Sequence, residues 1–202
     1  MKPRMIALVL VVIVSAAGRA FGDDVVDGKF GPGALYRMAR PTVWNGSLLL
    51  YAHGYVGPTA PIALPAEAEA LIGQFTARGF AVAYTSFAEN GWAVKDGAQR
   101  THQLLGLFSG RFGAPARVYL VGGSMGGLIA IKLEEQHPGL FDGVLTLCGV
   151  AGGTRQLFDY YAHTRALFDL LYPGTLPGDA GGVSAGIDIQ TAKITRTKPA
   201  LI

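Results

Sequence analysis

The chain has 202 residues, half of them apolar and only 15% charged, which excludes a disordered tail and fits one globular domain. Its 17 basic residues outnumber its 14 acidic ones, but Lys2, Arg4 and Arg19 account for the whole excess. From Phe21 onward, 14 basic residues face 14 acidic ones. The basic isoelectric point therefore gives no support to a nucleic-acid partner, and we expect none.

The first 20 residues have the pattern of a secretory signal peptide. Lys2 and Arg4 precede an almost unbroken apolar run at 5–17, and small residues follow that run. The run is shorter than the about 20 residues that a transmembrane helix needs. We therefore predict a signal peptide at 1–20, a secreted or periplasmic protein and no stable membrane anchoring. An uncleaved membrane anchor is the alternative.

Residues 21–46 contain glycine and proline without a clear period, so we predict an irregular segment there. The carboxylates of Asp23, Asp24 and Asp27 do not have the spacing of a calcium loop. We interpret these three residues as a solvated N-terminus of the mature chain.

From residue 47 onward, short apolar runs that suit buried strands alternate with segments of helical period. The predicted strands are 47–53, 80–87, 117–122 and 143–150, and the predicted helices are 65–78, 93–112 and 125–136. Strict alternation of strand and helix predicts an α/β fold, with a mostly parallel sheet and helices on both faces.

The last quarter of the chain has a different pattern. Residues 155–172 are rich in aromatic residues at helical spacing, and we predict a cap-like helical segment there. After Pro173 the chain is rich in glycine, and only 187–194 hints at a strand. Cys148 is the only cysteine, which excludes a disulfide within the chain, and its apolar neighbours predict a buried, inert thiol.

The most informative stretch is 122–127, which reads Gly-Gly-Ser-Met-Gly-Gly between a predicted strand and a predicted helix. It satisfies G-x-S-x-G, the nucleophile elbow, in the context that this motif requires. Side chains at Gly122 and Gly126 would collide in such a sharp turn. We predict Ser124 as the nucleophile and the Met125 N–H as an oxyanion donor. Neither dinucleotide nor P-loop spacing fits these glycines, and an incidental serine in a glycine-rich turn is the alternative.

A second element, His53-Gly54-Tyr55, directly follows the first predicted core strand. In this architecture the loop at that place supplies the other oxyanion N–H. We assign the Tyr55 N–H as the donor and Gly54 as the residue that allows the turn. We interpret His53 as a structural residue of the loop. No pattern in the sequence indicates a metal or an organic cofactor, and we expect neither.

The run 47–153 resembles the α/β-hydrolase superfamily and covers its strands three to six. Within it, Glu89-Asn90-Gly91-Trp92 and the Gly-Gly-Ser-Met-Gly-Gly turn resemble secreted bacterial esterases or prolyl-oligopeptidase-like serine hydrolases. The resemblance implies hydrolysis of a small-molecule ester or peptide substrate through an acyl-enzyme on Ser124. A serine peptidase and an inactive truncated product or pseudoenzyme stay open as alternatives.

The mechanism also needs a histidine and a carboxylate, which in this superfamily follow the serine on later loops. Only His137 and His163 follow Ser124. His137 is about 13 residues along the predicted helix, or roughly 20 Å away, which excludes it. We interpret His163, one turn after Asp159, as a lid residue and keep it as an alternative base. Because two more strand–helix units need roughly 30 residues each, we expect the acid and base beyond residue 202. Residues 21–202 are then a partial α/β-hydrolase domain that is truncated at its C-terminus.

Overall fold

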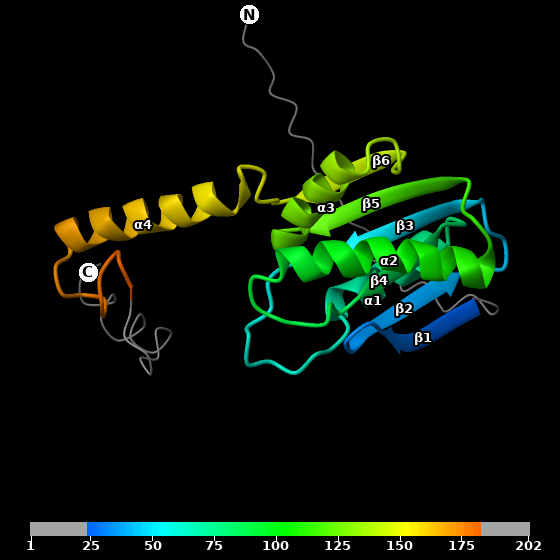
Figure 1. Cartoon of the computed structure of the whole chain (residues 1–202), viewed down its shortest axis with the longest axis horizontal. Helices are drawn as coiled ribbons and strands as arrows, with labels where there is room; N and C mark the ends of the chain where they lie inside the picture. Colours follow the sequence, from blue (N-terminus) through cyan, green and yellow to red (C-terminus); the bar gives the residue numbers. More distant parts are fainter. Residues whose placement is uncertain (1–23, 183–202) are drawn as a thin grey trace, which may run out of the picture. The chain divides into compact units, whose positions relative to one another are not determined.

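The fold is organised around a six-stranded sheet with the strand order β1-β2-β4-β3-β5-β6 (Figure 1). The computed structural model describes residues 24–182. The strands are β1 (Asp24–Phe30), β2 (Ala34–Arg40), β3 (Ser47–Ala52), β4 (Ala81–Thr85), β5 (Arg117–Gly123) and β6 (Gly143–Leu147). The helices are α1 (Ala66–Thr76), α2 (Val94–Phe112), α3 (Met125–Gln136) and α4 (Gly153–Leu171).

Strands β3 to β6 pair in parallel with one another, while β2 pairs antiparallel with both β1 and β4. The four predicted strands and three predicted helices are therefore confirmed, with small shifts of their bounds. The predicted α/β class, with a mostly parallel sheet, is also confirmed. The predicted strand at 187–194 and the predicted signal peptide lie outside the described residues.

The prediction of an irregular segment at 21–46 is wrong, because most of it forms an antiparallel hairpin of β1 and β2. The hairpin turn contains Gly31 and Gly33, both at positive φ. Asp27 is not part of a solvated terminus, because its carboxylate forms an ion pair with Arg37 across the hairpin at 2.6 Å. Asp24 likewise lies in β1, where it faces Arg40.

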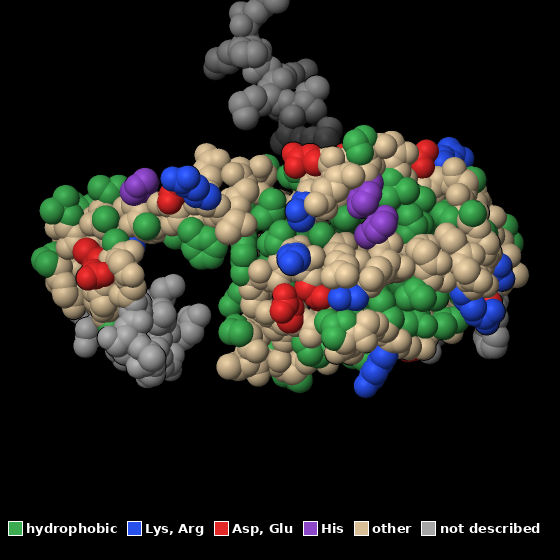
Figure 2. All heavy atoms as spheres, in the orientation of Figure 1, with side chains coloured by type: hydrophobic (Ala, Val, Ile, Leu, Met, Phe, Trp, Pro, Cys, Tyr) green, Lys and Arg blue, Asp and Glu red, His purple; other side chains and the backbone are tan. Residues whose placement is uncertain are grey.

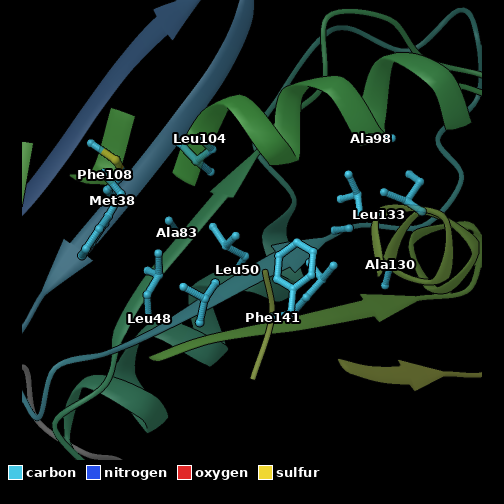
Figure 3. Packing of buried hydrophobic residues seen from close by; sticks show 14 of the residues in the cluster. Met38, Leu48, Leu50, Ala83, Ala98, Leu104, Phe108, Ala130, Leu133 and Phe141 are labelled. Atoms are coloured by element: carbon cyan, nitrogen blue, oxygen red, sulfur yellow. The ribbon is translucent and has the colours of Figure 1, made fainter. Parts of the chain in front are cut away.

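The core lies on both faces of the sheet, as expected for strands that are buried on both sides. All residues of β3 and β4 are buried. On one face, Leu48 and Leu50 of β3 pack with apolar residues of α2 and α3, and Figure 3 shows this cluster. On the other face, Leu49 and Tyr51 of β3 pack against α1. Helices therefore cover both faces of the sheet, as the sequence predicts.

Strand β6 ends at Leu147, three residues earlier than predicted. The next residue, Cys148, has a φ of 50° and is exposed. The prediction of a buried thiol is therefore wrong, because the chain turns away from the sheet at this left-handed residue before the apolar run ends.

The chain forms two compact units, and the boundary lies between Leu147 and Cys148. The second unit contains α4, which confirms the predicted helix at 155–172, and no residue of α4 is buried. Arg165 of α4 pairs with Asp169 at 2.9 Å and donates to the carbonyl of Gly178 at 2.8 Å, which folds the following turn against the helix. Within residues 24–182, no helix is long and apolar enough to cross a membrane.

Candidate active site

Backbone strain in the described residues is concentrated at one edge of the sheet. Three residues other than glycine have positive φ: Phe87 at 58°, Ser124 at 53° and Cys148 at 50°. Each lies within two residues of the carboxyl end of a parallel strand, β4, β5 or β6. Such conformations cost about 1–3 kcal/mol each and cluster at functional sites. In parallel α/β sheets, ligands bind at this same edge.

Ser124 connects β5 to α3, as the nucleophile-elbow motif predicts. Its backbone has a φ of 53° and a ψ of −116°. Its N–H donates to the carbonyl of Leu147 at 2.8 Å, and its own carbonyl accepts from the N–H of Gly127 at 3.0 Å. The serine is therefore fixed from two sides, by the end of β6 and by the first turn of α3.

The glycines around this serine leave no room for a side chain. A β-carbon at Gly122 would lie 2.0 Å from the carbonyl oxygen of Gly126. A β-carbon at Gly126 would lie 2.0 Å from the carbonyl oxygen of Ala52, at the end of β3. Both distances are far below van der Waals contact. The predicted requirement for glycine at these two positions is confirmed.

The structure brings the loop after β3 against the serine. This loop, residues 53–60, is called the oxyanion loop below, after the role that the sequence predicts for it. A β-carbon at Gly54 would lie 3.3 Å from Cβ and 3.9 Å from Oγ of Ser124. The side chain of Tyr55 is largely exposed, and that of Met125 is buried beneath the elbow. The backbone N–H of Met125 lies at the start of α3, where the helix dipole favours negative charge.

His53 is a buried structural residue of the oxyanion loop, in agreement with its interpretation from the sequence. Its ring stacks on Phe87 with 3.9 Å between ring centroids, and only 3% of the residue is exposed. Nδ1 donates to the carbonyl of Gly54 at 2.7 Å. Desolvation lowers the pKa of His53, and the carbonyls of Gly54 and Ser86 offset this effect in part. The ring is therefore neutral at neutral pH, and its proton serves to hold the loop.

A second loop, residues 86–92, lies beside the oxyanion loop and is called the bracing loop below. The N–H of Gly91 donates to the carbonyl of Val56 at 2.8 Å, and the side chain of Asn90 donates to the carbonyl of Ala60 at 2.7 Å. Residues 89–92, which carry part of the resemblance to esterases, thus hold the oxyanion loop. Sequence reasoning did not assign them this position.

Within residues 24–147, no side chain donates to or accepts from Oγ of Ser124. His137 lies at the opposite end of α3, where its ring stacks on that of His102 with 4.2 Å between centroids. Figure 2 shows two histidine side chains together on this surface, over α2 and α3. His163 lies on α4 in the second unit. The described residues 24–182 therefore do not identify the general base or the acid. Among these residues, no group of three or more histidine, cysteine, aspartate or glutamate side chains could hold a metal ion.

A family model with the description "Putative esterase" matches residues 46–166, which is more than half of the chain. This chain belongs to that esterase family. The matched region contains the oxyanion loop, the bracing loop and the elbow. It also contains Phe87, Ser124 and Cys148, the three strained residues at the sheet edge. No curated protein matches the sequence.

Solved structures resemble this member of the esterase family at low identity. A carboxyl esterase from Bacillus coagulans is 14% identical with a TM-score of 0.51, and the match covers 79% of this chain and 54% of that one. A probable hydrolytic enzyme from Pseudomonas aeruginosa PAO1 is 17% identical with a TM-score of 0.44, covering 88% and 61%. The chain thus spans little more than half the length of these structures. The family match and the strand order place it in the α/β-hydrolase superfamily, and the fold of the Bacillus coagulans esterase agrees with this.

Proposed function

We propose that this protein hydrolyses carboxylic esters through an acyl-enzyme on Ser124. The observation that carries the proposal is the strained backbone of Ser124 at the start of α3, with Gly54 packed against it. Strain of this kind is maintained only when the surrounding structure determines it. Membership of the esterase family supports an ester as the substrate.

In the proposed reaction, Oγ of Ser124 attacks the ester carbonyl carbon and gives its proton to a general base. The carbonyl oxygen becomes an oxyanion, which the N–H groups of Met125 and Tyr55 stabilise. Collapse of this intermediate breaks the bond to the alcohol, which leaves with the proton. Water then attacks the acyl-enzyme, releases the carboxylic acid and restores the serine hydroxyl.

The test is hydrolysis of p-nitrophenyl esters by the full-length protein, with the general base and acid that the reaction needs, and by its Ser124→Ala variant. We expect a fall in kcat of about 10⁶ when a triad nucleophile is lost. Ser109→Ala is the matched control, because Ser109 lies on α2 and its hydroxyl only donates to the carbonyl of Leu105. Equal rates for Ser124→Ala and the unmodified protein would refute the proposal. Faster cleavage of peptide amides than of esters would favour a peptidase.

We also propose export, on the sequence pattern of residues 1–20 alone. The mature protein then begins between Phe21 and Asp24. Mass spectrometry of the protein from the medium or periplasm measures this N-terminus. Recovery of a chain with Met1 in the membrane fraction would contradict export.

A further inference from the structure

The oxyanion loop has internal hydrogen bonds, and it is also held from outside by the bracing loop. The contacts that join the two loops include the stacked rings of His53 and Phe87, the hydrogen bond from Asn90, and the hydrogen bond from Gly91. The last of these is to Val56, the residue directly after Tyr55. Any movement of the bracing loop is therefore transmitted to the proposed oxyanion donor.

The bracing loop is in turn held by the first turn of α2. The carboxylate Oδ2 of Asp96 accepts from the N–H of Ala88 at 2.6 Å. The next residue of α2, Gly97, lies against the ring of Phe87, since a β-carbon there would be 2.9 Å from ring carbon Cε2. Phe87 is the strained residue of this loop, with φ at 58°. Asp96 thus fixes the loop directly beside its strained residue.

Asp96 itself is oriented by a buried ion pair. Nε of Arg100 donates to Oδ1 of Asp96 at 2.9 Å, and the two side chains are only 8% and 12% exposed. Arg100 also donates to Gln103 at 2.6 Å and lies over the ring of Phe30. Burying an ion pair adds little net stability, whereas removing one partner is costly. A role in setting geometry explains this pair better than a role in stability.

We propose that Asp96 is a positioning residue, which holds the oxyanion loop against Ser124 through the Ala88 N–H and the bracing loop. Arg100 fixes the carboxylate with one oxygen toward Ala88. This inference rests on the proposed function for its catalytic meaning, but the geometric claim stands on the contacts alone. Asp96 does not touch the substrate in this account and acts only through the two loops.

The test compares Asp96→Ala and Asp96→Asn with Leu104→Ala in the full chain. Leu104 is the matched control, because it is fully buried on the same helix but packs in the core. Asparagine retains one oxygen that can accept from the N–H of Ala88, whereas alanine retains none. The Asp96→Asn variant should therefore keep part of the hold on the bracing loop that Asp96→Ala loses. Where Asp96→Ala or Leu104→Ala does not fold, Asp96→Asn and Leu104→Val take their places.

Two measurements are made on each variant: amide hydrogen exchange in residues 53–60 and 86–92, and the rate at which a fluorophosphonate labels Ser124. For Asp96→Ala we expect faster exchange in both loops and about a 10-fold slower labelling rate, less than the 10²–10³ lost with an oxyanion donor. Leu104→Ala should lower the melting temperature without either local effect.

The two readouts separate the two proposals. Faster exchange in residues 86–92 without any change in 53–60 would overturn the positioning role, as would identical exchange in both Asp96 variants and the control. If the unmodified protein is never labelled at Ser124, the proposed function fails, and hydrogen exchange alone still decides whether Asp96 positions the oxyanion loop.

Discussion

Strand β3 and helix α4 are both apolar segments that the sequence predicts, yet they differ completely in burial. All six residues of β3 are buried, whereas none of the 19 residues of α4 is. Six large apolar side chains of α4 are exposed: Phe158, Tyr160, Tyr161, Leu167, Leu170 and Leu171. Figure 2 shows apolar side chains along this helix. Periodicity determines the type of element, but burial depends on what packs against it. The candidate site follows strands of the buried sheet, because the oxyanion loop follows β3 and the elbow follows β5.

The largest effect that we expect comes from filling the elbow. Gly122→Ala places a β-carbon 2.0 Å from the carbonyl oxygen of Gly126, so the turn cannot close without moving α3. We expect a loss of unfolding free energy above about 4 kcal/mol, the range that only a severe local defect reaches. Urea denaturation followed by circular dichroism measures it.

Gly106→Ala is the control for this substitution. Gly106 is a helical glycine on α2 with no atom within 4 Å of its added β-carbon. Replacing it should stabilise the protein by roughly 0.5–1 kcal/mol, because alanine is the better helix former. Equal losses at both positions would mean that the elbow is not closely packed.

The next effect tests the contrast between β3 and α4 directly. Leu50→Ala removes a fully buried side chain of β3, and we expect a loss of about 2–5 kcal/mol. Leu170→Ala makes the same chemical change where the side chain is 76% exposed, and we expect a change within about 0.5 kcal/mol. Unfolding curves of the two variants measure both. A large loss at Leu170 would show that α4 has a packing partner in solution.

The smallest effect is a pH dependence of stability from His53. Burial lowers its pKa below 6.5, so the folded protein binds this proton less readily than the unfolded chain does. As the pH falls below 6.5, the unfolded state takes up the proton first and stability decreases. His102 shifts in the same direction through its desolvation and the neighbouring His137. We expect a lower free energy of unfolding at pH 5.5 than at pH 7.5.

Two variants separate the histidines in this measurement. His53→Gln should remove part of the pH difference, and His102→Gln should remove another part. Asp27, whose pKa is lowered chiefly by its hydrogen bond with Arg37, contributes only as the pH falls below about 3.8. An unchanged pH difference in His53→Gln would show that the ring is not held neutral in the folded protein.

The parallel part of the sheet was predictable because its strands are continuous apolar runs, but the first hairpin was not. Side chains of Val26 and Phe30 point the same way along β1, and the position between them is Gly28. A β-carbon on Gly28 would collide with the ring of Tyr36, its partner in β2. The aromatic ring covers the glycine, so the alternation that reveals a strand is broken in the sequence.

The candidate site also has a part that the sequence predicts and a part that it does not. The elbow was predictable because close backbone contacts require glycine at Gly122 and Gly126, and the sequence records that requirement directly. Other contacts of the site join segments that are far apart in the sequence or lie in different elements, and only the folded sheet brings these segments together. Examples are the contact between His53 and Phe87 and the hydrogen bond between Asp96 and Ala88. A buried ion pair such as that of Asp96 with Arg100 reads in the sequence as an ordinary helical pair four residues apart.

The central claim is that Ser124 is the nucleophile, and covalent labelling tests it most directly. The full-length protein is treated with a fluorophosphonate, digested and mapped by tandem mass spectrometry. The account predicts a single adduct, on the peptide that contains Ser124, and no adduct in Ser124→Ala. Labelling of another residue, or equal labelling of Ser124→Ala, would contradict it.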